Sequence, residues 1–235
     1  MSSTPPSSAQ YVLDLPHRPA LGRDDFLVTD ANEAAAAAVE RWPDWRNPVM
    51  IICGPAGSGK SHLAAVWLSM TNAKQIVAAG LREAGVPELL SNGALLIEDA
   101  PSSQLDERAL FHAINLAREE KRTILITSRS SPAQWPVALP DLVSRLKAAE
   151  VAYLEAPDDA LLRGVLVKQF ADRQIAVDER IIGFMVARME RSFDALRVLV
   201  AEIDRRALTE RAEITRPFVS RVMADLAGQS ATTDE

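Results

Sequence analysis

The chain has 235 residues, of which 48% are hydrophobic and 25% charged, a composition typical of one large folded domain or two modest ones. Its net charge of −6 is unlike that of a free-standing DNA-binding protein, which usually carries a basic surface. A single cysteine, Cys53, excludes a disulfide framework and makes the cytoplasm the expected compartment. No signal-peptide pattern and no apolar run near the roughly 20 residues of a membrane helix is present, so we expect no membrane partner.

The N-terminal segment combines a polar stretch, residues 1–9, with the apolar sequence QYVLDLP at residues 10–16. Apolar side chains in such a tail either pack on the chain's own domain or bind a partner. A helix is expected to follow, because an alanine run ends at Val39 and Asp30 or Asn32 is suited to cap its start.

From Pro48 onward, short apolar runs alternate with amphipathic stretches. The apolar runs are expected to be strands at residues 48–54, 74–80, 93–100, 122–129 and 151–157, and the stretches between them helices at 60–70, 82–91, 105–121 and 139–149. This alternation predicts an α/β fold whose parallel sheet is buried on both faces.

After Pro157 the strand pattern stops, and four amphipathic helices are predicted at residues 158–174, 178–190, 192–211 and 215–228. We therefore expect a flexible tail at 1–19, an α/β nucleotide-binding domain at 20–156, a small all-helical lid domain at 157–227 and a disordered end at 228–235.

GPAGSGKS, residues 54–61, fits the phosphate-binding pattern G-x-x-x-x-G-K-[ST] and stands between a predicted strand and a predicted helix, as that motif requires. Its backbone N–H groups would surround a phosphate, Lys60 would reach the β- and γ-phosphates, and Ser61 would ligate Mg²⁺. The predicted nucleotide-binding residues here are Gly54, Pro55, Ala56, Gly57, Ser58, Gly59, Lys60, Ser61 and His62.

Two further strand ends carry polar groups. GALLIEDA ends in acids, which predicts Glu98 as a second magnesium ligand and Asp99 as the residue that orients the attacking water. In RTILITSR, Thr127 or Ser128 is a candidate contact to the γ-phosphate or to that water. Acids and hydroxyls also occur at ordinary strand ends, which is the alternative interpretation.

The order of these motifs resembles the AAA+ ATPases of the DnaA/Hda family. GKSHL resembles the end of that family's P-loop, LPDLVSRL at 139–146 its arginine-finger segment, and PFVSRVMADL at 217–226 its closing helix. The resemblance covers about residues 20–227. It implies an AAA+ domain followed by a helical lid, with ADP or ATP and Mg²⁺ as cofactors.

Several site residues follow from this resemblance. Arg145 falls on the arginine finger, which acts in trans on a neighbour's nucleotide. The segment that lies over the adenine corresponds to 26–35 and offers Leu27, Val28 and Asn32.

The chain departs from the family at two places. Asp194 stands where the lid usually presents a nucleotide-sensing arginine, with Arg197 one turn on, and KAA at 147–149 replaces a Trp-Gly pair. These departures lead us to expect weak or no ATP hydrolysis by the chain alone.

The N-terminal segment then gains a meaning, because QYVLDL fits Q-x-x-L-x-[LF], a pattern similar to the peptide that binds the bacterial sliding clamp. Gln10 would occupy a polar subsite, and Leu13 and Leu15 would fill an apolar groove.

The resemblance implies a regulator in the cytoplasm at the replisome. Tethered to the DNA-loaded clamp, it would promote hydrolysis of DnaA-bound ATP and so repress re-initiation. It would meet DNA only through the clamp, and self-association is left open. The alternatives are a self-assembling ATPase or helicase loader acting on DNA, a small-molecule kinase, and a scaffold with a vestigial pocket.

Overall fold

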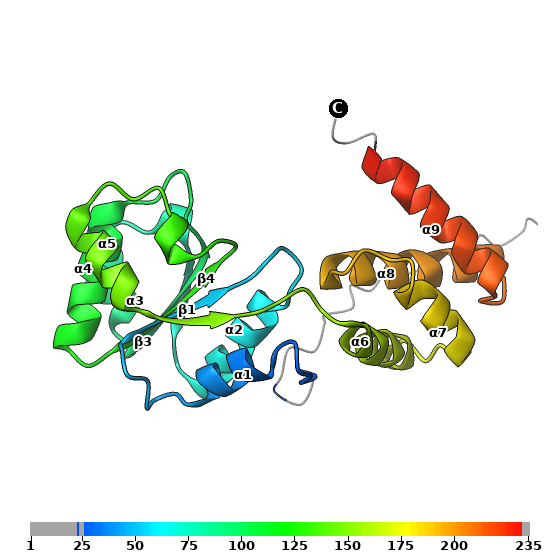
Figure 1. Ribbon diagram of the computed structural model, residues 1–235, viewed down its shortest axis with the longest axis horizontal. Coiled ribbons are helices and arrows are strands. Elements are labelled where there is room, and N and C mark those ends of the chain that lie inside the picture. The colour runs from blue at the N-terminus through cyan, green and yellow to red at the C-terminus, as the bar shows by residue number, and fades with distance from the viewer. Residues whose placement is uncertain (1–22, 24–25, 232–235) are drawn as a thin grey trace, which may run out of the picture.

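The computed structural model describes Arg23 and residues 26–231, and the fold within that range is a parallel sheet followed by a helical lid (Figure 1). The sheet has five parallel strands in the order β2–β3–β4–β1–β5. The strands are β1 (Val49–Cys53), β2 (Lys74–Val77), β3 (Ala94–Ala100), β4 (Thr123–Ser128) and β5 (Glu150–Tyr153). The predicted α/β class with an all-helical lid is thereby confirmed.

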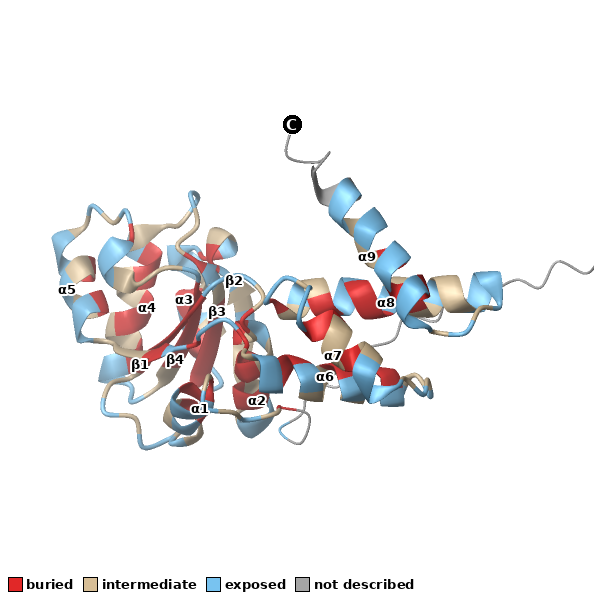
Figure 2. Cartoon of the chain, turned by 45° about the vertical axis from the view of Figure 1, so that its right-hand side comes forward, coloured by how far each residue is buried: buried red, intermediate tan, exposed pale blue. Residues whose placement is uncertain are grey.

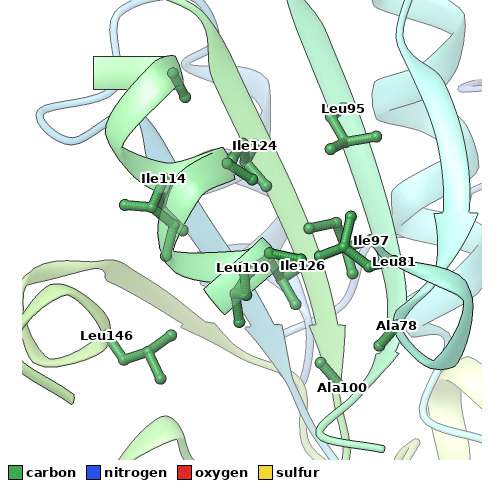
Figure 3. Close-up of a cluster of buried hydrophobic side chains, with 14 of the residues drawn as sticks. Ala78, Leu81, Leu95, Ile97, Ala100, Leu110, Ile114, Ile124, Ile126 and Leu146 are labelled. Atoms are coloured by element: carbon green, nitrogen blue, oxygen red, sulfur yellow. The ribbon is translucent and has the colours of Figure 1, made fainter. Parts of the chain in front are cut away.

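Two buried clusters explain why the central strands are apolar on both faces (Figure 2). On one face, Leu95, Ile97 and Ile126 pack against α3 (Val86–Leu90), α4 (Glu107–Glu119) and α5 (Pro140–Ala148) (Figure 3). On the other face, Met50 and Ile52 pack against α1 (Glu33–Glu40) and α2 (Lys60–Met70). A strand covered on both faces has no polar side to present, so it appears in the sequence as a continuous apolar run.

Short 3₁₀ helices adjust the chain around this sheet. They are η2 (Ala78–Gly80), η3 (Glu83–Gly85) and η4 (Pro132–Gln134). The first replaces the end of the strand predicted at 74–80, because β2 stops at Val77 and Ala78 turns into the core.

The helical lid consists of α6 (Asp159–Asp172), α7 (Glu179–Val186), α8 (Phe193–Glu210) and α9 (Arg216–Ala231). It has a core of its own, in which Leu166, Phe170, Leu199 and Val219 are buried. Helix starts are fixed by side-chain caps, with bonds from the backbone N–H of the third helical residue to Asp158 at 2.7 Å and to Ser192 at 3.1 Å. None of the helices in the described residues is both long and apolar enough to span a membrane.

Candidate functional site

The P-loop joins the end of β1 to the start of α2, at the carboxyl edge of the sheet. Its first residue is held by a backbone bond of 3.1 Å from Gly54 N to Ser128 O on β4. A side chain at Gly54 would place its Cβ 2.4 Å from the Leu154 carbonyl oxygen, so only glycine fits. The loop therefore lies where parallel α/β sheets bind ligands, outside the carboxyl ends of the strands.

Lys60 lies inside this loop rather than extending into solvent. Its ammonium donates to the carbonyl oxygens of Gly54 at 2.8 Å and Pro55 at 2.6 Å, and the residue is buried. Burial, and then the positive charge of Arg129, lower the pKa of Lys60. A buried cation in contact only with neutral oxygens favours an approaching anion, which would offset both effects.

The hydroxyl of Ser58 supports the same conclusion. Its Oγ is buried and has no hydrogen-bond partner among the described residues. Unsatisfied buried polar groups are rare in folded proteins and mark places where a ligand or water belongs. The orphaned hydroxyl, the glycine-rich backbone and the buried ammonium together fit a phosphate group.

The neighbouring thiol has a different role. Cys53 is the last residue of β1 and is buried. Burial raises the pKa of its thiol, although the charge of Lys60 acts in the opposite direction. Its side chain therefore behaves as a core residue and not as a reactive nucleophile.

The lid contacts the P-loop directly. The backbone N–H of Phe193 donates to Gly57 O at 2.8 Å, at the point where α8 begins. Gly57 has a φ of +66°, and a Cβ there would come within 2.5 Å of the Ser192 Cβ. The absence of a side chain at Gly57 is thus what allows the lid to approach.

A cavity of about 380 Å³ opens between these parts. The P-loop contributes Lys60 and Ser61 to its lining, and lid helix α6 contributes Leu161 and Val165. Its size is within the range of small-ligand sites, which are about 300–1,000 Å³ and largely apolar with a few polar groups. The remaining residues of its lining are Phe26, Leu27, Asn32, Gly57, Gly59, His62, Lys168, Gln169, Asp172, Phe193, Asp194 and Arg197.

The segment before α1 takes part in this cavity, but not with every predicted residue. Leu27 and Asn32 line it, whereas Val28 is 42% exposed and does not. The Asn32 side chain accepts from Thr29 N at 2.8 Å and donates to Leu27 O at 2.9 Å. Asn32 precedes α1 but makes no capping bond to it, so its side chain shapes the turn that places Leu27.

An aromatic contact that the sequence did not indicate lies beside this turn. The ring of Phe26 meets that of His62 edge to face, with centroids 5.2 Å apart, and both residues line the cavity. Phe26 is seven residues before α1, and no spacing rule connects it with the P-loop, so only the folded chain reveals the pair.

The acid predicted at the lid sensor position is paired. Asp194 and Arg197 both line the cavity and form an ion pair one turn apart on α8. The carboxylate is therefore compensated by its own helix, and the repulsion that it would exert on a phosphate is reduced.

The acidic end of β3 is distorted. The register with β4 shifts between Ile97 and Ala100, and Asp99 has a φ of +56°. Glu98 accepts a hydrogen bond from Gln75 on the neighbouring strand β2. Its carboxylate thus already has a partner on β2, and no group of three or more acid, histidine or cysteine side chains suited to a metal occurs in the described residues.

The hydroxyls at the end of β4 also have partners. The Thr127 Oγ1 accepts from Asp99 N at 3.1 Å, so it ties the two strand ends together. The Ser128 Oγ donates to Ser130 O at 2.7 Å and accepts from Trp135 Nε1 at 3.2 Å. Both residues are buried, and neither lines the cavity.

Arg129 follows directly after β4 and was not among the residues predicted from the sequence. It is exposed, acts electrostatically on Lys60, and lines a second cavity of about 420 Å³ with Asp99 and Ser130. A cation directly after a polar strand end was the available signal.

Arg145 lies on α5, far from the chain's own cavity. Figure 1 shows α5 at the end of the sheet region remote from the lid. The buried side chains of Leu142 and Leu146 fix the helix on the core, and Figure 3 shows Leu146 there. Arg145 itself is half-buried and forms no ion pair or side-chain hydrogen bond within the described part of the chain. Gln10, Leu13 and Leu15 of the tail motif lie outside the described residues.

A parallel sheet in the order β2–β3–β4–β1–β5, a P-loop after β1 and a helical lid that contacts it define an AAA+ fold. Solved structures of that class share it. Domain III of the Thermotoga maritima replication initiation protein DnaA aligns with a TM-score of 0.77 and 20% identity, over 90% of this chain and 98% of that one. The Thermotoga maritima RuvB Holliday junction branch migration motor aligns with a TM-score of 0.65 and 17% identity, over 82% and 66% of the two chains.

A closer assignment comes from the lid. Residues 159–223 match the family model for the lid domain of Hda. The chain is therefore an AAA+ protein related to Hda and DnaA. A curated relative, an uncharacterized protein of Haemophilus influenzae, is 27% identical over 192 residues, which are 77% of this chain and 83% of that protein. DnaA from Aquifex aeolicus, solved with AMPPCP bound, aligns with a TM-score of 0.61 and 17% identity, over 80% and 68% of the two chains.

Proposed function

We propose that this chain is a regulator of replication initiation that promotes hydrolysis of ATP bound to a DnaA initiator while tethered to the DNA-loaded sliding clamp. Its product is DnaA–ADP, which represses re-initiation. The chain acts in the cytoplasm at the replisome and hydrolyses little or no ATP by itself.

Nucleotide binding by the chain is the first part of the proposal. Lys60 and the P-loop backbone hold the phosphates of ADP or ATP, and Leu27 and Asn32 lie on the base side of the same cavity. Bound Mg²⁺ would neutralise phosphate charge. Ser61, exposed on the first turn of α2, is its ligand, whereas Glu98 reaches a metal only by giving up Gln75.

The observation that carries the proposal is the position of Arg145. It is a cation without an internal partner among the described residues, on a rigid helix and remote from the chain's own cavity. An arginine so placed has no role in its own nucleotide site but suits one presented by a second molecule, where it stabilises charge on the transferred phosphate. The Hda-type lid supports a DnaA-related partner.

The tail provides the second contact. Gln10, Leu13 and Leu15 bind the clamp, and each buried leucine contributes up to about 1.5–3 kcal/mol before ordering costs. Such a short contact is weak alone, but the clamp is a ring with repeated sites, so avidity strengthens it.

The test is single-turnover hydrolysis of DnaA-bound ATP in the presence of clamp loaded on DNA. The wild-type chain should accelerate it, and Arg145→Ala should reduce that acceleration by roughly 10³-fold or more, since arginine fingers contribute that much. Lys147→Ala on the same helix is the matched control, because it removes one exposed positive charge without removing the finger. Equal activity of Arg145→Ala and wild type would refute the proposal.

A self-assembling ATPase acting on DNA is the second candidate, favoured by one observation. The same chain carries a nucleotide cavity and, on a distant helix, Arg145 with no ion-pair partner among the described residues, so head-to-tail copies would complete each other's sites. That function predicts turnover by the protein alone that rises with its concentration. Turnover that stays negligible at all concentrations excludes it.

A further inference from the structure

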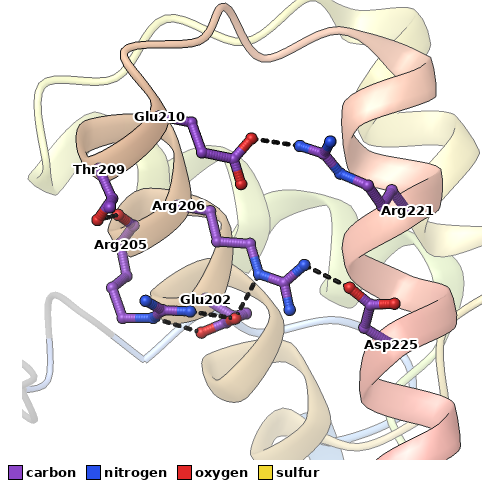
Figure 4. Close-up of polar contacts among 7 residues, drawn as sticks. All are labelled: Glu202, Arg205, Arg206, Thr209, Glu210, Arg221 and Asp225. Atoms are coloured by element: carbon purple, nitrogen blue, oxygen red, sulfur yellow. Dashed lines mark hydrogen bonds and ion pairs between the residues drawn. The ribbon is translucent and has the colours of Figure 1, made fainter.

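Most cations of the lid have a carboxylate partner. Figure 4 shows part of this pattern, where Glu202 receives Arg205 at 2.7 Å and Arg206 at 2.5 Å, and Arg206 also reaches Asp225 at 2.5 Å. The other pairs are Arg163–Glu179, Lys168–Asp172, Arg173–Asp204, Arg191–Asp159, Arg197–Asp194 and Arg221–Glu210. Charge compensation is thus the rule in this part of the chain, and an exception needs an explanation.

The exceptions gather around one aromatic ring. Arg188 of α7 and Arg216 of α9 place their guanidinium carbons 4.3 Å and 4.8 Å from the centroid of Phe184. Arg180 lies one turn before Phe184 on the same face of α7. All three arginines are exposed, and none has an ion pair within the described residues. The nearby acids Glu190 and Glu213 do not pair with them either.

The ring fixes the positions of these charges. Stacking of a guanidinium on an aromatic face is favourable by about 0.5–1 kcal/mol at an exposed site and leaves the N–H donors free. The donors of Arg188 and Arg216 therefore face solvent from two different helices that share one anchor. A planar guanidinium with free donors matches a phosphate group in a two-bond arrangement.

We propose that Arg180, Arg188 and Arg216 form a binding surface for the sugar–phosphate backbone of DNA. Charge complementarity carries the inference, because a chain with a net charge of −6 concentrates three uncompensated arginines on one side of its lid. The contact is independent of base sequence, since the surface offers cations to phosphates but no groups arranged toward base edges.

This surface is separate from the nucleotide site. None of its three arginines lines the cavity beside the P-loop, and it is formed by α7 and α9, whereas the P-loop meets α8. The inference goes beyond the proposed function, in which DNA is reached only through the clamp. It therefore stands or falls without the clamp, the initiator or ATP hydrolysis.

The test is fluorescence anisotropy of a labelled duplex and of a single strand of the same length, with the purified chain and no other protein. Wild type should bind DNA at about 50 mM salt and weaken steeply toward 200 mM. Three phosphate contacts predict a slope of log K against log salt of about −3 for the duplex. A labelled polyglutamate peptide is the comparison for acidic protein surfaces, and it should bind at least tenfold more weakly.

Variants assign the binding to the surface. Arg188→Ala and Arg216→Ala should each reduce the magnitude of the salt slope by about 1. The triple alanine variant should lose at least tenfold in affinity, and the triple lysine variant should keep most of it. Arg205→Ala is the control with the same change in net charge, and it should keep the wild-type slope because its guanidinium is engaged by Glu202.

Three results overturn the proposal. They are no DNA binding by wild type at about 50 mM salt, equal DNA affinity of wild type and the triple alanine variant, and equal binding of DNA and polyglutamate. Thermal unfolding of each variant checks that it is folded, and all three arginines are exposed, so no core contact is lost.

Discussion

Replacing Gly57 by alanine tests whether the lid depends on contact with the P-loop. Alanine at a φ of +66° costs about 1–2 kcal/mol in backbone strain. Its Cβ would lie 2.5 Å from the Ser192 Cβ, far inside normal contact, and overpacking of this kind typically costs about 1–3 kcal/mol. We expect Gly57→Ala to lower the free energy of unfolding by about 2–5 kcal/mol and to disrupt the bond from Phe193 N to Gly57 O.

Two other glycines separate strain from collision. Gly93 has a φ of +86°, and a Cβ added there would meet nothing within 4 Å, so Gly93→Ala should lose only about 1–2 kcal/mol. Gly85 has a φ of −87° and equally open surroundings, so Gly85→Ala should be neutral or stabilising by about 0.4–1 kcal/mol.

Urea unfolding followed by circular dichroism gives the three stabilities, and titration with a fluorescent ADP analogue gives the affinities. Only Gly57→Ala should weaken nucleotide binding as well, because it alone displaces the start of α8 from the cavity. If Gly57→Ala is no less stable than Gly93→Ala and binds ADP normally, the lid does not rest on the P-loop and the reasoning fails.

Two further predictions concern charges. Asp194→Asn should tighten ATP binding about two- to fivefold in the same titration, because Arg197 is released toward the cavity and surface pairs contribute up to about 1 kcal/mol; an unchanged or weaker affinity would contradict this. Hydrogen bonds first from Arg205 and then from Arg206 lower the pKa of Glu202 to about 2, so its ionised form stabilises the fold above its ordinary pKa of about 4.3 and this contribution fades as the pH falls through the lowered value. Glu202→Gln should therefore cost about 1 kcal/mol in urea unfolding at neutral pH and nothing at the acid end, whereas a loss independent of pH would indicate packing instead.

Much of the fold was predictable because local chemistry repeats along the chain. The apolar runs that became β1, β3 and β4 are continuous since each strand is covered on both faces, and a buried strand cannot hide that pattern. The P-loop was equally plain, because its glycines and Lys60 serve a phosphate through backbone groups only a few residues apart.

Residues far apart in the chain were harder to assign. Sequence reasoning gave Glu98 and Ser128 roles at the phosphate from their places at strand ends, but their partners are Gln75 and Trp135. Those bonds join separate elements across the sheet, so no local pattern indicated them. For Val28, the pattern also gave no sign that the side chain faces solvent while Leu27 faces the cavity.

By itself the sequence determined the parallel sheet, the helical lid and the phosphate-binding loop, because each depends on residues that are neighbours along the chain. Tertiary structure alone decided that Asp194 meets the cavity already paired with Arg197, that Arg145 lies away from it, and that Arg188 and Arg216 share the ring of Phe184. The physical reason is that charge compensation depends on distance in space, and packing of separate helices sets that distance.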